Sequence, residues 1–328
     1  MDIELTPALQ GTKYQQWKDF LSRCGLTADE NVSRTVLIWD EGELIATASR
    51  QENLLKCIAV DESRQGEGLT AVLLTQLRQD AFQDGHSHLF LYTKPKNKFM
   101  FSSLFFYPVA QTGDVLLMEN RKDGIQDFLK DLPVDTGKTV GAAVMNCNPF
   151  TKGHRYLIET AAAECDRLYV FVLSEDKSEF SAKDRLEMVR LGTADISNVT
   201  VLPTGPYLIS SATFPTYFLK ERDKAQQIHC LLDIEIFCQY FVPKFGITHR
   251  YIGTEPLSAM TNQYNEALLA HLPQKGISVR QIPRMELDGI PVSASAVRKA
   301  LVEENTEALE NLLPATTRDY LKSIGSIK

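Results

Sequence analysis

The stretch NPFTKGHRYLIE, from Asn148 to Glu159, follows the apolar run VGAAVMNC and marks the passage from a buried strand into a helix. The first turn of that helix holds Thr151, Gly153 and His154. Glycine is a poor helix former, and a histidine at a helix start needs a partner. Either this is an ordinary strand-to-helix turn, or these residues form a phosphate-binding site.

A helix that starts here has the features of an anion site. The first amides of a helix have no partners inside it, and the helix dipole adds positive potential. Gly153 lacks a Cβ, so a ligand can approach the backbone closely. Thr151 and His154 are three residues apart and share one face of the first turn, where an imidazole N–H can hydrogen-bond to a phosphate. The alternative is a capped helix in which Thr151 satisfies the backbone and His154 is solvated, and the short motif alone leaves both open.

The residues around this stretch predict a parallel sheet. From Thr139 onward, apolar runs alternate with helical patterns, which is typical of a parallel sheet covered on both faces by helices. Ligands of such sheets bind at the carboxyl ends of the strands. The predicted strands cover residues 139–147, 167–174, 198–204, 249–255 and 277–285, and the predicted helices cover residues 154–166, 182–195, 223–242 and 263–274 and the chain from residue 296 onward.

Two further stretches of this region carry candidate binding residues. The stretch IPVSASAVRKAL places Ser293 at a helix N-cap, with Ser295 and Arg298 three residues apart in the first turns. The stretch YIGTEP reads as a strand that ends at Gly253, where the backbone can approach a flat ring. The alternatives are an ordinary serine cap with a surface arginine, and a plain turn.

The first third of the chain reads as a mixed α+β domain. Its loop RQGEGLT lies between a strand and a helix, and the amides of such a loop can cradle a pyrophosphate. The charged stretch at residues 119–138 predicts a connection between two domains, residues 1–130 and residues 138–328. The predicted elements of the first domain are a hairpin at residues 35–50, strands at residues 54–63 and 88–94, a helix at residues 69–85 and an aromatic-rich element at residues 99–110.

Composition narrows the class of protein. The chain has 328 residues and a formal net charge of -7, which argues against broad contact with nucleic acid or anionic lipid. No apolar run approaches the ~20 residues that span a bilayer, so we expect no membrane partner. The start MDIELTPALQ lacks a signal pattern, and the six cysteines lack metal-site spacing. We therefore expect a cytoplasmic protein with reduced thiols.

The stretch TKGH after a strand, together with SASAVR near the C-terminus, resembles the two signatures of the nucleotidyltransferase superfamily, (H/T)-x-G-H and I-S-x-(T/S)-x-x-R. The resemblance covers about residues 139–328, with Val292 in place of isoleucine and Thr151 in place of the first histidine. It implies a Rossmann-like parallel-sheet domain that binds ATP, with catalytic roles for His154 and Arg298. The implied ATP-binding residues are Asn148, Pro149, Phe150, Thr151, Gly153, Gly253, Thr254, Glu255, Ser293 and Ser295.

Four stretches in order, CNPFTKGHRYLIE, SEFSAKDRLEMV, YLISSATFPTYFLK and HRYIGTEP, are similar to the citrate lyase ligase family. That resemblance implies an AMP-forming acid–thiol ligase that uses ATP and Mg2+ to activate acetate as acetyl-AMP. The acetyl group then passes to the prosthetic-group thiol of the citrate lyase acyl carrier protein. Further residues that we expect to contact phosphate or substrate are Lys183, Arg185, Ser210, Ser211 and Thr213. The alternatives are a solvated helix face for the two basic residues and a polar loop for the other three.

The loop from Arg64 to Thr70 resembles the glycine-rich loop of the GNAT acetyltransferases, with Gln65, Gly66 and Gly68 as the implied coenzyme A contacts. Thr70 stands where that family has glycine or alanine, and the added bulk leaves coenzyme A binding open. A GNAT-like first domain can bind coenzyme A, bind the carrier protein or be inactive. Two rival functions remain for the whole chain. One is an adenylyltransferase acting on a phosphopantetheine-like or mononucleotide acceptor, and the other is a non-catalytic nucleotide or coenzyme A sensor.

Overall fold

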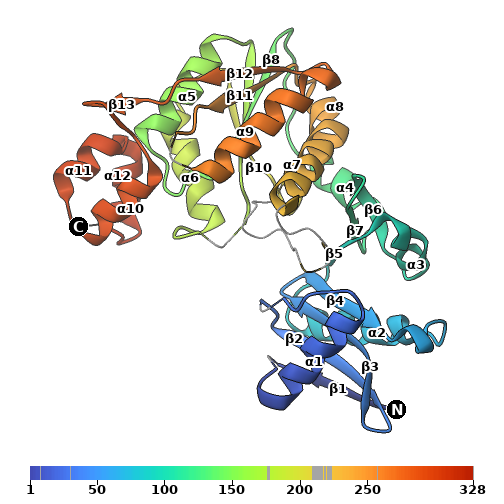
Figure 1. The fold of residues 1–328 in the computed structure, drawn as a ribbon. Coiled ribbons are helices and arrows are strands. Elements are labelled where there is room, and N and C mark those ends of the chain that lie inside the picture. The colour runs from blue at the N-terminus through green and yellow to red at the C-terminus, as the bar shows by residue number, and fades with distance from the viewer. Residues whose placement is uncertain are drawn as a thin grey trace. The chain divides into compact units, whose positions relative to one another are not determined.

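The computed structural model describes residues 1–7, 9–29, 31–175, 178–208, 217, 219, 224–256 and 258–327 (Figure 1). Its internal contacts divide the chain into two compact units. The first unit comprises Met1–Ile125 with Thr213–Leu232, and the second comprises Gln126–Ala212 with Asp233–Lys328. The domain boundaries at residues 130 and 138 stay a prediction. None of the described helices is both long and apolar enough to cross a membrane.

The first unit contains a seven-stranded sheet in the order β1-β2-β3-β4-β5-β7-β6. Strands β4 and β5 pair in parallel, and the other neighbours pair antiparallel. The predicted hairpin and the two predicted strands are confirmed. The strands are β1 (Asp2–Thr6), β2 (Arg34–Asp40), β3 (Glu43–Gln51), β4 (Leu54–Val60), β5 (Phe90–Thr93), β6 (Tyr107–Gln111) and β7 (Leu116–Glu119).

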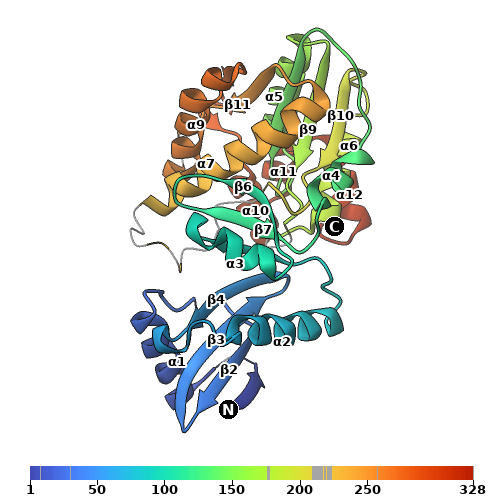
Figure 2. The same ribbon diagram turned by 90° about the vertical axis from the view of Figure 1, so that its right-hand side faces the viewer.

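Helix α2 (Leu69–Gln83) lies across β2, β3 and β4, as Figure 2 shows. Its apolar side chains recur every three or four residues and therefore form one face, which is buried against the sheet. The helix ends at Gln83, and Gly85 follows the C-cap residue Asp84 with a φ of +85°, a conformation that glycine adopts easily. The unit also has α1 (Gly11–Arg23), α3 (Lys98–Ser103) and two short 3-10 helices, Glu62–Arg64 and Pro95–Asn97. Helix α1 and strand β1 were not predicted from the sequence.

The second unit is built on a five-stranded parallel sheet in the order β10-β9-β8-β11-β12. The chain runs outward from β8 to β10 on one side and then crosses to β11 and β12 on the other. The strand order therefore reverses between β8 and β11, which is where ligands of such sheets bind. The five predicted strands are confirmed as β8 (Val140–Met145), β9 (Arg167–Val172), β10 (Val199–Pro203), β11 (His249–Gly253) and β12 (Ser278–Ile282).

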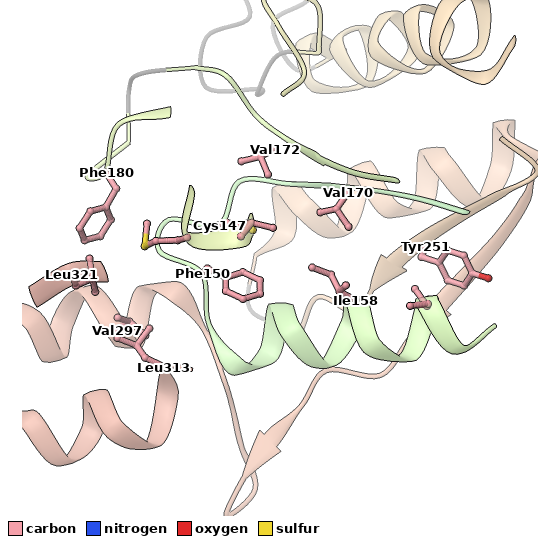
Figure 3. Close-up of a cluster of buried hydrophobic side chains, with 14 of the residues drawn as sticks. Cys147, Phe150, Ile158, Val170, Val172, Phe180, Tyr251, Val297, Leu313 and Leu321 are labelled. Carbon is pink, nitrogen blue, oxygen red and sulfur yellow. The ribbon is translucent and has the colours of Figure 1, made fainter. Parts of the chain in front are cut away.

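Both faces of this sheet are covered, as the side chains of β9 show. Tyr169 and Phe171 contact the rings of Phe241 and Phe245 on one face. On the other face, alternate residues of β9 join the core formed by α5 (Lys152–Ala163) and α6 (Ala182–Thr193) (Figure 3). The near-continuous apolar run of β9 follows from this double burial.

The long helix predicted for residues 223–242 is interrupted. Its described part consists of α7 (Ala225–Ile236), a π-helix (Phe237–Phe241) and α8 (Val242–Phe245). Pro243 lies in the first turn of α8, where its missing N–H and its ring disfavour a regular α-helical turn before it. Residue 223 lies outside the described residues.

The C-terminal helices form a group whose apolar side chains join the core beside the N-terminal end of α5 (Figures 1 and 3). Val297 and Leu313 pack in the same cluster as Phe150, so the start of α10 is held close to the start of α5. A two-stranded hairpin, β13 (Glu286–Leu287) with β14 (Ile290–Pro291), leads into α10. The remaining helices are α4 (Gly124–Lys130), α9 (Ala259–His271), α10 (Ala294–Val302), α11 (Thr306–Leu312) and α12 (Ala315–Ser323), with a 3-10 turn at Pro273–Lys275.

Candidate active site

The start of α5 is fixed by a reciprocal pair of hydrogen bonds between Thr151 and His154. The backbone N–H of His154 donates to Thr151 Oγ1 (3.3 Å), and the backbone N–H of Thr151 donates to His154 Nδ1 (3.0 Å). Together they form a capping box in which histidine takes the place that glutamate or glutamine usually has. Thr151 therefore caps the helix, as the ordinary interpretation predicted.

The same contact determines which ring nitrogen of neutral His154 carries the proton. Because Nδ1 accepts a hydrogen bond from an amide, the neutral ring carries its proton on Nε2. Burial, and secondarily the positive charge of Arg284, lower the pKa of His154 to about 4. Within the part of the chain that the structure describes, Nε2 has no hydrogen-bond partner. His154 is thus a neutral, partly buried donor rather than a solvated side chain.

The two helix starts singled out in the sequence meet in space. Arg298 Nη1 donates to the carbonyl oxygen of Asn148 (2.6 Å), and its Nη2 donates to Ser295 Oγ (3.2 Å). A Cβ placed on Gly153 would lie 3.1 Å from the carbonyl oxygen of Val292, so the glycine permits this close approach. The segment before α10 therefore packs directly on the first turn of α5.

These helix starts border a cavity of about 420 Å3 at the carboxyl edge of the sheet, a volume that suits a small-molecule site. The cavity brings together residues from α5, β11 and α10 that lie far apart in the sequence. Arg298 does not line the cavity itself, but it donates a hydrogen bond to Ser295, which does. The predicted site residues that line it are Thr151, Gly153, His154, Gly253, Thr254, Glu255, Ser293 and Ser295.

Three predicted residues lie beside the cavity and shape its loop. Phe150 is fully buried in the core, and the side-chain oxygen of Asn148 accepts from the backbone N–H of Phe180 (3.1 Å). Pro149 lies between them and is buried, and the Asn148–Pro149 peptide bond is cis. Direct ATP contacts from these three residues stay a prediction.

The two basic residues of α6 differ. Lys183 is exposed, as the solvated-face alternative expects. For Arg185 that alternative is wrong, because the side chain is fully buried and donates to the carbonyl oxygens of Phe180 (3.1 Å) and Asn146 (3.0 Å). Arg185 thereby stabilises the loops that follow β8 and β9. Ser210, Ser211 and Thr213 lie outside the described residues.

Sequence reasoning missed three residues that line the cavity. Arg284 donates to Glu255 Oε2 (2.7 Å) and places positive charge near His154. Asn265 donates to the carbonyl oxygen of Gly253 (2.9 Å), and Arg250 lies on β11 itself. Arg284 follows the carboxyl end of β12, so the rule that ligands bind at strand ends was sufficient to select it.

The predicted glycine loop of the first unit also faces a cavity, of about 590 Å3. Gly66 and Gly68 have φ values of +89° and +79°, and Gly68 precedes α2 without a side-chain cap. Gln65 lines the same cavity, as does Thr70, whose side chain adds the expected bulk. Contact of this loop with coenzyme A stays a prediction.

Known families account for both parts of the chain. The model of the citrate lyase ligase C-terminal domain matches residues 140–321, more than half of the chain. The chain belongs to the citrate lyase ligase family. The model of the GNAT acetyltransferase family matches residues 4–101. The predicted family, the predicted fold class and the prediction of a ligase are therefore confirmed.

Relatives within the citrate lyase ligase family match nearly the whole chain. The citrate (pro-3S)-lyase ligase of Klebsiella pneumoniae is 41% identical over 312 residues, which cover 93% of this chain and 91% of the relative. That of Escherichia coli is 38% identical over 323 residues, covering 96% of this chain and 92% of the relative. This family member is therefore an enzyme, and the rival interpretations are not favoured.

Two further likenesses cover smaller shares of the chain. A phosphopantetheine adenylyltransferase of Clostridium botulinum is 45% identical over 56 residues, 16% of this chain and 34% of that protein. A crystal structure of an acyl-CoA N-acyltransferase from Pseudomonas aeruginosa is 12% identical, with a TM-score of 0.33, and covers 37% of this chain and 99% of its own.

Proposed function

We propose that this ligase activates acetate with ATP as acetyl-AMP and transfers the acetyl group to the prosthetic-group thiol of the citrate lyase acyl carrier protein. Diphosphate leaves in the first step and AMP in the second. The observation that supports the ATP chemistry is the meeting of the α5 and α10 starts at one cavity, through Arg298 and Asn148. We place the enzyme in the cytoplasm, where its six free cysteines stay reduced.

The first step needs positioning more than covalent chemistry. A carboxylate oxygen of acetate attacks the α-phosphorus of ATP, and the bond from that phosphorus to the bridging oxygen of the diphosphate breaks. His154 donates its Nε2–H to an oxygen of the α-phosphate and keeps its proton throughout. Because its Nδ1 is held by the amide of Thr151, the ring is oriented before the substrate arrives.

The β- and γ-phosphates fit the start of α10. Free backbone amides, the helix dipole, the hydroxyl of Ser295 and the guanidinium of Arg298 supply donors and positive charge there. Among the described residues, no group of three or more His, Cys, Asp or Glu side chains is placed to hold a metal ion. Mg2+ would therefore bind mainly to the phosphates of the nucleotide and neutralise their charge.

The carboxyl end of β11 fits the rest of the nucleotide. We propose that Gly253, Thr254 and Glu255 lie near the adenine or ribose. Their backbone is fixed, because Thr254 Oγ1 accepts from the amide of Arg284 (2.9 Å) and Asn265 donates to Gly253. A backbone that is already fixed can orient the bound nucleotide without having to rearrange when it binds.

In the second step the carrier thiol attacks the acetyl carbonyl carbon. A carbon–sulfur bond forms, the bond from carbon to the AMP oxygen breaks, and the thiol proton passes to solvent. Neutral His154 can keep its hydrogen bond to the departing AMP phosphate, because its proton is not consumed in the first step.

An exchange of labelled diphosphate into ATP tests the proposal. The proposed reaction predicts exchange that requires acetate and no phosphate-bearing acceptor. Exchange that requires a phosphopantetheine-like or mononucleotide acceptor would instead support an adenylyltransferase, and no exchange with any acceptor would support a sensor.

A further inference from the structure

A buried arginine at the inner part of the active-site cavity has no role in the chemistry described so far. Arg250 lies on β11, is 3% exposed and lines the cavity. Its Nε and Nη1 groups are buried and have no hydrogen-bond partner in the part of the chain that the structure describes. Since a buried guanidinium stays charged and its unpaired N–H groups destabilise the fold, this arrangement points to a bound ligand.

The described surroundings of Arg250 contact its charged guanidinium but form no ion pair with it. The guanidinium carbon lies 4.7 Å from the ring centroid of Phe237, which supports a cation over its face. Burial lowers the pKa of Arg250, and the nearby Tyr264 and Asp233, which are hydrogen-bonded to each other, oppose that lowering only in part. No described carboxylate lies within ion-pair distance of Arg250.

The position of Arg250 distinguishes it from the phosphate-binding groups. It precedes Gly253, the last residue of β11, by three positions, which is roughly 10 Å along a strand. The donors proposed for the phosphates lie at the helix starts, at the carboxyl edge of the sheet. Tyr264 and the apolar side chain of Leu268 line the same cavity.

We propose that Arg250 binds the carboxylate of the acyl substrate and thereby selects a short monocarboxylic acid. This inference rests on the proposed function. One carboxylate oxygen accepts a hydrogen bond from Nη1, and the other faces His154 and the α-phosphate along the same cavity. The guanidinium also offsets the repulsion between an anionic nucleophile and a polyanionic nucleotide. The methyl group of acetate packs against the apolar wall.

The test compares Arg250→Gln and Arg250→Lys with Arg280→Gln. Arg280 lies opposite Tyr251 on the neighbouring strand, is exposed and does not line the cavity, so it controls for the loss of a positive charge. We expect Arg250→Gln to raise the acetate KM ~10- to 100-fold, as for the loss of charge-assisted hydrogen bonds, with Arg250→Lys intermediate. The Kd for ATP, titrated without acetate, should change less than twofold in all three variants.

The outcomes separate this inference from the proposed function. If the wild-type protein shows no acetate-dependent exchange, the proposed function fails. If the wild type shows acetate-dependent exchange, two results for Arg250→Gln would show that Arg250 does not bind the carboxylate. One is an unchanged acetate KM, and the other is a loss of ATP affinity as large as the rise in acetate KM. Should Arg250→Gln fail to fold, the milder variant Arg250→Lys decides. A folded Arg250→Lys protein should then show a raised acetate KM with unchanged ATP affinity, whereas an acetate KM equal to that of the wild type would overturn the inference.

Discussion

Replacing His154 by asparagine or by glutamine separates its two hydrogen bonds. The side-chain oxygen of asparagine can take the position of Nδ1 and accept from the amide of Thr151, but it leaves no donor at the position of Nε2. The side-chain amide of glutamine reaches the position of Nε2 and can donate there. His154→Ala removes both interactions. The three variants therefore affect stability and catalysis differently.

The magnitudes follow from the separate roles. Loss of a capping interaction costs about 0.5–2 kcal/mol, so we expect His154→Ala to lower the free energy of unfolding by about 1 kcal/mol and His154→Asn to change it by less than about 0.5 kcal/mol. Loss of a donor to a phosphate that gains charge in the transition state typically costs ~10²–10³ in rate. His154→Ala and His154→Asn should both show that loss, and His154→Gln should lose about tenfold or less.

Acetate-dependent exchange of diphosphate into ATP measures the rates, and thermal melting followed by circular dichroism measures stability. Near-normal exchange by a folded His154→Asn protein would refute the role of Nε2 as a donor. If His154→Gln were as inactive as His154→Asn, then the shape of the ring rather than the donor would be what matters.

Three other perturbations test neighbouring parts of the site. A Cβ at Gly153 would lie 3.1 Å from the carbonyl oxygen of Val292, so Gly153→Ala should shift the α10 start by a few tenths of an ångström and lower the exchange rate roughly three- to tenfold. The control Gly113→Ala, which has open space around its Cβ, should leave the exchange rate unchanged, and equal rates in the two variants would contradict this expectation. Because burial lowers the pKa of His154 from 6.5 to about 4, the unfolded chain binds its proton first as pH falls. This group therefore leaves the free energy of unfolding unchanged above about pH 6.5 and lowers it as pH falls through 4, by about 2 kcal/mol at pH 5. Melting of wild type and His154→Asn at pH 7 and pH 5 checks this, and identical shifts would count against it. Arg298→Gln should weaken ATP binding in calorimetric titration ~10-fold or more without changing the acetate KM, whereas unchanged ATP affinity would exclude a phosphate contact.

The parts of the fold that the sequence predicted are those with strong local patterns. Strand β9 is apolar on both faces, and α2 carries leucines at helical spacing, so each element could be recognised from its own residues. The motif around Thr151 and His154 is also local, since one turn of helix holds both. Strand β1 escaped prediction because it is a short edge strand with mostly exposed side chains, and α1 because only three of its residues are buried.

The parts of the site that the sequence did not predict depend on contacts across the chain. Arg298 bonds to Asn148, which is 150 residues away, and no local pattern indicates that partner. Arg250 looks like any strand residue until its burial and its unpaired N–H groups are seen. Arg185 has a basic side chain on a helix, which reads as solvated, but the loops after β8 and β9 enclose it.

A crystal structure of the enzyme with Mg2+ and α,β-methylene ATP, which cannot release diphosphate, would locate the triphosphate. We expect the β- and γ-phosphates between the starts of α5 and α10, in contact with Arg298 and Ser295, and an oxygen of the α-phosphate within hydrogen-bond distance of His154 Nε2. Phosphates bound at the glycine loop before α2, or anywhere away from the cavity beside β11, would contradict the proposed chemistry.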